Sequence, residues 1–365
     1  TPLYSSAASD VYKRQVAKVA AVQIPGVKLE AVRVSPELGQ VLVQARKKEF
    51  KSEPLRAVLS YRQNIPLLRL KTGKQVALEP IRAERMPTAQ EKAAAAKVPA
   101  DTEKYIAHIR LPWIDIIRRV RVVLPLDTVD HRTCQTAIRD QLDRQTCVAH
   151  ASMAGLEGFY KCKQNVTRDL SENHTYHIFM QREASTCRAD PGIQTWRAAG
   201  YLSSQHVCAE SAMPYTNMAG VPTNDATHVP AGCSGSAPYG FADTQVIFGT
   251  AFGGDPTVNA NNTNYLESLL ASGYDIVYGT YMAGNDWHDG TAETGIVDVQ
   301  MIGGAPAPAW AGHAMLLVGY NRSSQYFIFK NSWGTDFGRA GYVYVSYNYL
   351  QTYGKYGYII KSVTP

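Results

Sequence analysis

Cys147 stands at a point of the sequence where a thiolate would be stabilised. Apolar residues follow it at roughly helical spacing, at Val148, Ala151 and Leu156, and Thr146 before it is an acceptable N-cap. Cys147 is therefore predicted in the first turn of a helix. There the positive end of the helix dipole, with an imidazolium nearby, can lower a thiol pKa from about 8.5 into the range of roughly 3.5–7.5.

A lone cysteine on a helix is most often a buried small hydrophobe, so other residues must decide whether Cys147 is catalytic. Gln141 lies six residues before it and could point its side-chain amide at the same spot. Two distant segments carry further chemical groups. They are Ala311-Gly312-His313-Ala314, which opens a run ending in Val318-Gly319-Tyr320, and Asn331-Ser332-Trp333-Gly334.

Together these segments resemble the papain family of cysteine peptidases. That family has a glutamine six residues before its nucleophilic cysteine, a histidine leading a strand that ends in Val-Gly-Tyr, and an Asn-Ser-Trp-Gly segment. Gln141, Cys147, His313 and Asn331 match these positions in order and in residue type. The joint match favours a functional interpretation over four unrelated structural residues.

The resemblance implies a mechanism of peptide hydrolysis. Cys147 would attack the scissile carbonyl and form a thioester, while His313 acts as base and then acid and Asn331 orients its ring. The Gln141 amide and the Cys147 backbone N–H would bind the oxyanion. Trp333 would cover the Asn331–His313 hydrogen bond and border the leaving-group side of the cleft. No cofactor is implied, and no His, Cys, Asp or Glu cluster has the spacing of metal ligands.

The expected fold class is α+β. A helical pattern runs from Cys147, and Pro191–Tyr201 is expected as a further helix, whereas the last third carries short β-branched and aromatic runs. This fits the papain-like two-lobed fold, in which a cleft separates a helical lobe from an antiparallel β-barrel-like lobe. Residues 213–262, rich in Gly, Pro, Asn and Thr, are predicted to be mostly loop. The expected strands are Ala314–Asn321, Tyr326–Asn331, Gly341–Tyr347 and Tyr356–Val363.

Three regions are predicted along the chain. Residues 1–15 resemble a sequencing artefact or a disordered tail, and residues 124–365 would form the papain-like catalytic domain. Residues 16–123 are a small β-rich N-terminal region, either an inhibitory prosegment or an attached accessory domain. Its expected strands are Val16–Val22, Gln40–Gln44, Arg56–Tyr61 and Pro66–Leu70, and residues 86–104 are expected to be a helix or an exposed linker.

The net charge of +6 is unevenly distributed. Residues 1–125 hold 23 Lys and Arg against 11 Asp and Glu, and the rest of the chain holds 14 against 20. The two parts should attract each other, so the N-terminal region is expected to dock on the catalytic domain. Acid would protonate carboxylates of residues 126–365 and weaken the docking.

Small residues before His313 indicate where a substrate side chain would bind. Ala311 and Gly312 would leave an adjoining pocket open to a bulky apolar group. Insertions within 213–262 and 282–310 would form long loops that border the cleft and shape substrate choice.

Five cysteines remain besides Cys147. Arg144 stands where the family usually has a disulfide cysteine, so one usual bridge is absent or rerouted. The expected pairs are Cys208 with Cys233 and Cys162 with Cys187, which leaves Cys134 over.

The predicted function is that of a cysteine endopeptidase acting on peptide or protein substrates. Two alternatives stay open, a catalytically silent binding or storage protein on the same fold and an acyltransferase using the same thioester. Nucleic acid is not an expected partner, because no recognised binding motif accompanies the basic residues. A membrane is not expected either, because no apolar run reaches about 18 residues. An extracellular, periplasmic or lysosome-like compartment would fit the Asn-X-Ser/Thr sequons at Asn165, Asn173, Asn261 and Asn321.

Overall fold

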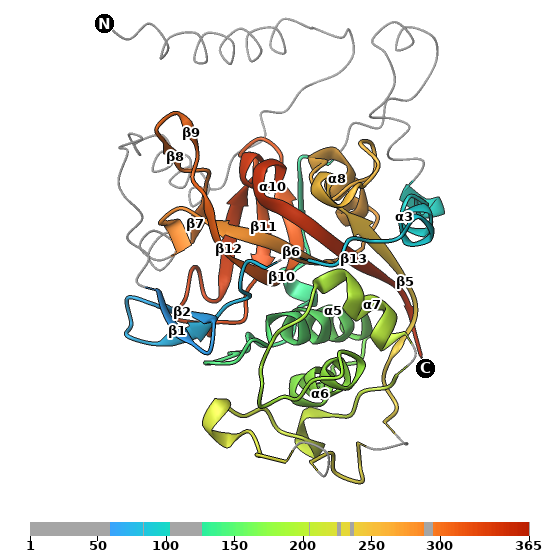
Figure 1. Ribbon diagram of the computed structural model, residues 1–365. Helices are drawn as coiled ribbons and strands as arrows, with labels where there is room; N and C mark the ends of the chain where they lie inside the picture. The colour runs from blue at the N-terminus through green and yellow to red at the C-terminus, as the bar shows by residue number, and fades with distance from the viewer. Residues whose placement is uncertain are drawn as a thin grey trace, which may run out of the picture. The chain divides into compact units, whose positions relative to one another are not determined.

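The computed structural model describes residues 59–82, 84–102, 126–203, 205–224, 228–233, 237–287 and 295–364. Within them, α5 (Cys147–Gln164), α6 (Glu172–Arg182) and α7 (Thr195–Leu202) precede every strand of a large sheet except β4 (Thr128–Asp130), and the long helix α5 packs against that sheet (Figure 1). This arrangement confirms the α+β class. The expected strands Val16–Val22 and Gln40–Gln44 and the stretch Tyr105–Val123 lie outside the described residues.

Helix α5 is buried along most of its length and ends at Asn165, whose left-handed backbone conformation terminates it. Gly155 lets the helix approach the sheet closely, because a Cβ there would lie 3.2 Å from the Leu316 side chain and 3.3 Å from that of Val277. No helix of the described residues is both long and apolar enough to cross a bilayer. After α5 come the α-helices α6 (Glu172–Arg182), α7 (Thr195–Leu202), α8 (Thr263–Ala271) and α10 (Tyr347–Tyr353). Short 3-10 helices span Arg132–Cys134, Glu210–Ala212, Met218–Gly220 and Thr250–Phe252.

In the described part of residues 126–364, the large sheet has eight strands. Its order is β5, β13, β6, β10, β11, β12 and β7, with β4 paired to β10, and only the β12–β7 pairing is parallel. Strand β10 starts at Ala309 rather than at the expected Ala314, because its first residues pair with β6. The strands are β4 (Thr128–Asp130), β5 (Phe241–Phe248), β6 (Ile276–Ala283), β7 (Ile296–Val297), β10 (Ala309–Asn321), β11 (Tyr326–Lys330), β12 (Tyr342–Ser346) and β13 (Gly354–Val363), and β8 (Met301–Ile302) and β9 (Ala305–Pro306) form a separate hairpin.

The N-terminal segment, by which we mean residues 59–102 without residue 83, is β-rich as predicted. It contains β1 (Leu59–Arg62), β2 (Ile65–Arg69) and β3 (Gln75–Ala77) in one antiparallel sheet, followed by α3 (Ala89–Ala95). Four of its apolar side chains belong to the same buried cluster as Trp333 and the strands of the large sheet. The segment therefore shares the main hydrophobic core that the large sheet forms. These side chains are Leu68, Leu70, Val76 and Leu78.

The described residues of 213–262 are mostly loop, as predicted, but the prediction misses one strand. Strand β5 lies within them and pairs along its length with β13, at the edge of the large sheet. The partner strand comes from the far end of the chain, so local composition could not reveal the pairing.

One of the two expected disulfides is confirmed. Cys208 is bonded to Cys233, but the pairing of Cys162 with Cys187 is wrong, because Cys162, near the end of α5, is bonded to Cys134. Cys187 keeps its thiol, and its sulfur lies 4.0 Å from His177 Nδ1.

Arg144 is fully buried at the position where the family usually has a cysteine. Its Nη1 donates to Asn173 Oδ1 at 2.8 Å and to the Thr216 carbonyl at 3.1 Å. The guanidinium also lies 5.4 Å and 5.2 Å from the ring centroids of Tyr176 and Tyr215. A cation therefore joins the start of α5 to α6 and to the loop around residue 216 without a covalent bond.

Substituting Cys134 with serine should destabilise the chain, because the Cys134–Cys162 bond joins residues 28 positions apart. The free energy of unfolding should fall by about 2–5 kcal/mol, measured by urea unfolding of the full chain. Cys187→Ser is the matched control and should cost much less, since Cys187 forms no disulfide. Equal losses in the two variants, or a non-reducing peptide map that joins Cys162 to Cys187, would contradict the pairing.

Candidate active site

Cys147 is the first residue of α5, as the sequence predicts. It is 3% exposed, and the backbone N–H groups of Ala314 and Val148 lie within hydrogen-bonding reach of its sulfur. Ala314 directly follows His313 on β10. The packing of α5 on the sheet therefore brings the thiol beside the residues around His313.

The His313 ring is held from two sides. Its Nε2 donates to Asn331 Oδ1 at 2.8 Å, and Trp333 stacks on it with 4.6 Å between ring centroids. The pairing of β10 with β11 brings these residues together, because Asn331 directly follows Lys330, which is opposite Leu316. Among the described residues, His313 Nδ1 has no hydrogen-bond partner. The ring is thus fixed at one nitrogen and open to a proton at the other.

The Gln141 side chain is held in place as firmly as the histidine. Its Oε1 accepts from Ser332 Oγ at 2.8 Å, and its Nε2 donates to the carbonyls of Arg144 at 3.1 Å and Ala77 at 2.9 Å. Because Ser332 lies between Asn331 and Trp333, the segments that hold the histidine also hold the glutamine. The amide lies in the turn that leads to Cys147.

Burial suppresses ionisation at the site in this structure. It raises the pKa of the Cys147 thiol to about 12, and the negative charge of Glu79 acts in the same direction. Burial also lowers the pKa of His313 to about 4, although its hydrogen bond to Asn331 opposes the change. The sequence predicts a lowered thiol pKa, but here the covered site contains a neutral thiol and a neutral imidazole at pH 7.

The N-terminal segment covers the site. Glu79 forms an antiparallel bridge with Gly312, in which the Glu79 N–H donates to the Gly312 carbonyl at 3.0 Å and the Gly312 N–H donates to the Glu79 carbonyl at 2.7 Å. The Ala77 carbonyl accepts from Gln141, and Lys74 Nζ donates to the Trp333 carbonyl at 2.8 Å. One extended stretch of the segment thus contacts residues beside both the thiol and the histidine.

The two small residues before His313 have different surroundings. Ala311 is buried in the hydrophobic core, whereas Gly312 faces the segment. A Cβ on Gly312 would lie 2.7 Å from Glu79 Oε2, so a larger residue would exclude the glutamate. The space beside Gly312 therefore holds a carboxylate of the N-terminal segment in this structure, while the apolar substrate group expected there stays a prediction. Neither Glu79 nor its partner Lys355 could be recognised from the sequence, because no local motif connects them.

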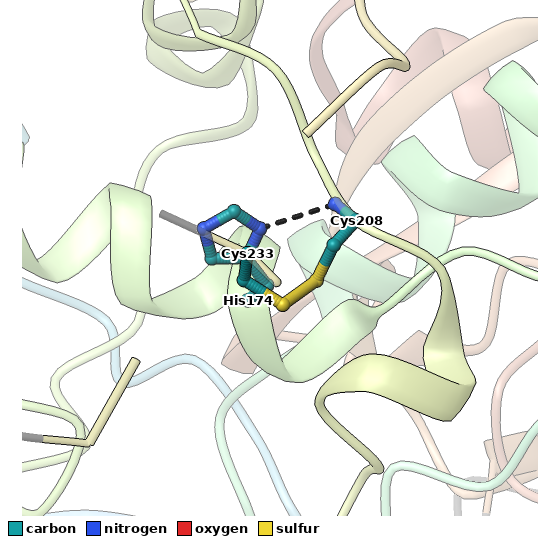
Figure 2. A group of neighbouring side chains, drawn as sticks. All are labelled: His174, Cys208 and Cys233. Atoms are coloured by element: carbon teal, nitrogen blue, oxygen red, sulfur yellow. Dashed lines mark hydrogen bonds between the residues drawn. A yellow bond between two sulfur atoms is a disulfide. The ribbon is translucent and has the colours of Figure 1, made fainter. Parts of the chain in front are cut away.

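One group of potential metal ligands occurs in the described residues. The ligand atoms of His174, Cys208 and Cys233 lie within 4.8 Å of one another and are buried (Figure 2). The two sulfurs are bonded to each other, and the Cys208 N–H donates to His174 Nδ1 at 3.2 Å. These atoms are therefore engaged with one another, and the group lies in the helical half with the disulfide.

Comparisons with known proteins agree with this geometry. A viral cathepsin of Cydia pomonella granulosis virus is 26% identical over 227 residues, which cover 61% of this chain and 57% of that protein. An uncharacterized peptidase C1-like protein of Acanthamoeba polyphaga mimivirus is 33% identical over 101 residues, which cover 26% of this chain and 30% of that protein. The chain thus spans about a third to three fifths of the length of these relatives.

The fold also matches a solved structure, that of xylellain, a cysteine protease from Xylella fastidiosa. The TM-score is 0.57 at 19% sequence identity, and the match covers 78% of this chain and 96% of that one, which establishes a common fold. A family profile described as papain family cysteine protease matches residues 125–360, which include every residue of the site named above except those of the N-terminal segment. The chain therefore belongs to the papain family of cysteine proteases.

Proposed function

We propose that the protein is a cysteine endopeptidase that cleaves peptide or protein substrates through a thioester on Cys147. The observation that carries the proposal is the 2.8 Å hydrogen bond between His313 and Asn331, beside a buried thiol at a helix start. A silent binding protein would not need an imidazole oriented in this way next to a cysteine.

Each step of the hydrolysis has a residue to perform it. His313 Nδ1 takes the proton of the Cys147 thiol, and the thiolate attacks the scissile carbonyl carbon. The resulting oxyanion accepts hydrogen bonds from Gln141 Nε2 and the Cys147 backbone N–H, and loss of one such donor typically costs about 10²–10³ in rate. The imidazolium then gives its proton to the leaving amine, and water hydrolyses the thioester with His313 as base.

An epoxide inhibitor of thiol proteases should label Cys147 once the N-terminal segment has been displaced, because the thiolate formed with His313 opens the epoxide. The full chain is incubated with the inhibitor between pH 4 and 8 and analysed by peptide mapping. Cys147→Ser should abolish the label, while Cys187→Ser, which removes the other thiol, should retain it. Label on any other residue, or none at any pH, would refute the proposed chemistry.

We further propose that the N-terminal segment is an inhibitory prosegment. In the docked arrangement the Ala77 carbonyl occupies the Gln141 amide, where the oxyanion would bind, and Glu79 occupies the backbone of Gly312. The apolar side chains shared with the core supply affinity, since burial contributes about 25 cal/mol per Å² of apolar surface. Substrate therefore has no access while the segment stays in place.

Basic side chains of the segment also pair with carboxylates of the catalytic domain. Arg62 Nη2 lies 2.7 Å from Asp190 Oδ2, and its Nη1 lies 3.3 Å from Asp143. Lys74 pairs with Asp140. These pairs match the opposite charges of the two regions. Salt would not easily screen the attraction between Arg62 and Asp190, because Asp190 is fully buried.

Asp190 makes the docking sensitive to acid. Burial raises its pKa to about 6, although the Gln145 N–H and the charges of Arg144 and Arg62 act downward. Because Arg62 departs with the segment, the pKa of Asp190 is lower in the docked state than in the same buried site without it. The ion pair therefore favours docking above about pH 6, and this contribution is lost as the pH falls through 6. Such release suits the lysosome-like setting among the expected compartments.

Arg62→Ala should let the epoxide label Cys147 faster than in the unaltered chain at pH 7, by about tenfold for a loss of about 1.4 kcal/mol in docking. The difference should shrink below pH 6, where the unaltered chain also releases the segment. Arg69→Ala is the matched control, since Arg69 is an exposed residue of the same small sheet. Equal labelling rates for all three chains at pH 7 would contradict a role of Arg62 in inhibition.

A further inference from the structure

Lys355 is a buried cation next to the candidate active site. It lies on β13 and is 1% exposed, with its Nζ 4.7 Å and 4.8 Å from the ring centroids of Tyr281 and Tyr356. Its Nζ lies 3.4 Å from Glu79 Oε2 and also pairs with Glu84. Both carboxylates belong to the N-terminal segment, so the catalytic domain supplies the cation and the segment supplies the anions.

Glu79 occupies a space bordered by Gly312, Tyr281, Tyr356 and Lys355, which we call the pocket, and it enters as a residue of an extended peptide would. Its backbone N–H and carbonyl both pair with Gly312, the residue before His313, and Gly312 in turn lies opposite Tyr281 in the sheet. From that backbone its side chain reaches Lys355 through space that the missing Cβ of Gly312 leaves open. Glu79 therefore shows which kind of side chain fits beside the catalytic histidine.

Removal of the segment changes the charge balance of the pocket. Burial alone would lower the pKa of Lys355, but the carboxylates of Glu79 and Glu84 raise it, so it is charged while the segment is docked. After release both anions are gone, and a largely desolvated ammonium faces the cleft. Burying a charge without a partner is costly, so an anion that re-enters the pocket is favoured over a neutral group.

We infer that the pocket beside Gly312 selects an acidic side chain of the substrate, and that Lys355 is the residue that determines this specificity. The inference rests on the proposed peptidase function. An apolar side chain could pack on Tyr281 and Tyr356, but it would seal Lys355 in the pocket without an anion. A glutamate makes the same ring contacts along its methylenes and also pairs with the ammonium, as Glu79 does.

The test uses peptidyl epoxides that differ only in carrying Glu, Gln or Leu at one position. Each of the two residues nearest to the epoxide is varied in turn, and the rate of Cys147 labelling is measured on the full chain under conditions where the segment has been released. At one position the Glu probe should react at least about tenfold faster than the Gln probe, which corresponds to one buried charge-assisted hydrogen bond. The Leu probe should be slower than the Glu probe.

Lys355→Met should bring the ratio of the Glu and Gln rates to about 1, because it keeps the length of the side chain and removes the charge. Lys361→Met is the matched control, since Lys361 lies on the same strand but pairs with Asp243 outside the pocket. Its ratio should equal that of the unaltered chain. The ratio of the Glu and Gln rates does not depend on how much of the segment has been released. If Lys355→Met does not fold, the ratio in the unaltered chain still tests the preference for an acidic side chain.

The outcomes separate the two proposals. Labelling of Cys147 with equal Glu and Gln rates at both positions, or with Leu ahead of Glu, would overturn the role of Lys355 and leave the peptidase function standing. No labelling by any probe would refute the peptidase function, and the acidic specificity with it.

Discussion

The packing of α5 on strands β6, β10 and β13 is the contact on which the site depends. It places the start of the helix, with Cys147, against the stretch of β10 that carries His313, and the close approach at Gly155 fixes its distance from the sheet. The same desolvation that positions the thiol and the imidazole also keeps both neutral. Cys147 and His313 are thus already in position while both are neutral. Exposure of the cleft to water would reduce the cost of ionising them.

Buried charges in the papain-family part of the chain explain why the N-terminal segment fits it closely. Asp190 and Lys355 are both buried, and each is paired with a side chain of opposite charge from the segment. Such pairs add less to stability than their Coulomb energy suggests, because both charges lose water, but leaving one partner alone is costly. The segment is therefore matched to this surface by the positions of its charges as well as by its apolar side chains. The charge positions make the fit specific, because apolar contacts alone could be made by many apolar peptides.

Sequence patterns predicted the site residues that belong to short local motifs. The order of Gln141, Cys147, His313 and Asn331 identified the family, which the family profile confirms, and the C-terminal strands followed from their β-branched and aromatic runs. The partner of Cys162, the strand β5 and the contact between Glu79 and Lys355 were beyond reach, because each depends on residues distant in sequence that only the folded core brings together. The pKa of Cys147 was predicted in the wrong direction for the covered site, since a helix-start position reveals the dipole but not the burial.

Arg144 gives the start of α5 an anchor that does not respond to redox potential. A thiol nucleophile must stay reduced, and the reductants that preserve it also threaten the Cys134–Cys162 and Cys208–Cys233 bonds. The anchor closest in sequence to Cys147 consists of hydrogen bonds and ring contacts, which accept no electrons. A medium reducing enough to keep Cys147 as a thiol therefore leaves intact the link that holds its helix start to α6.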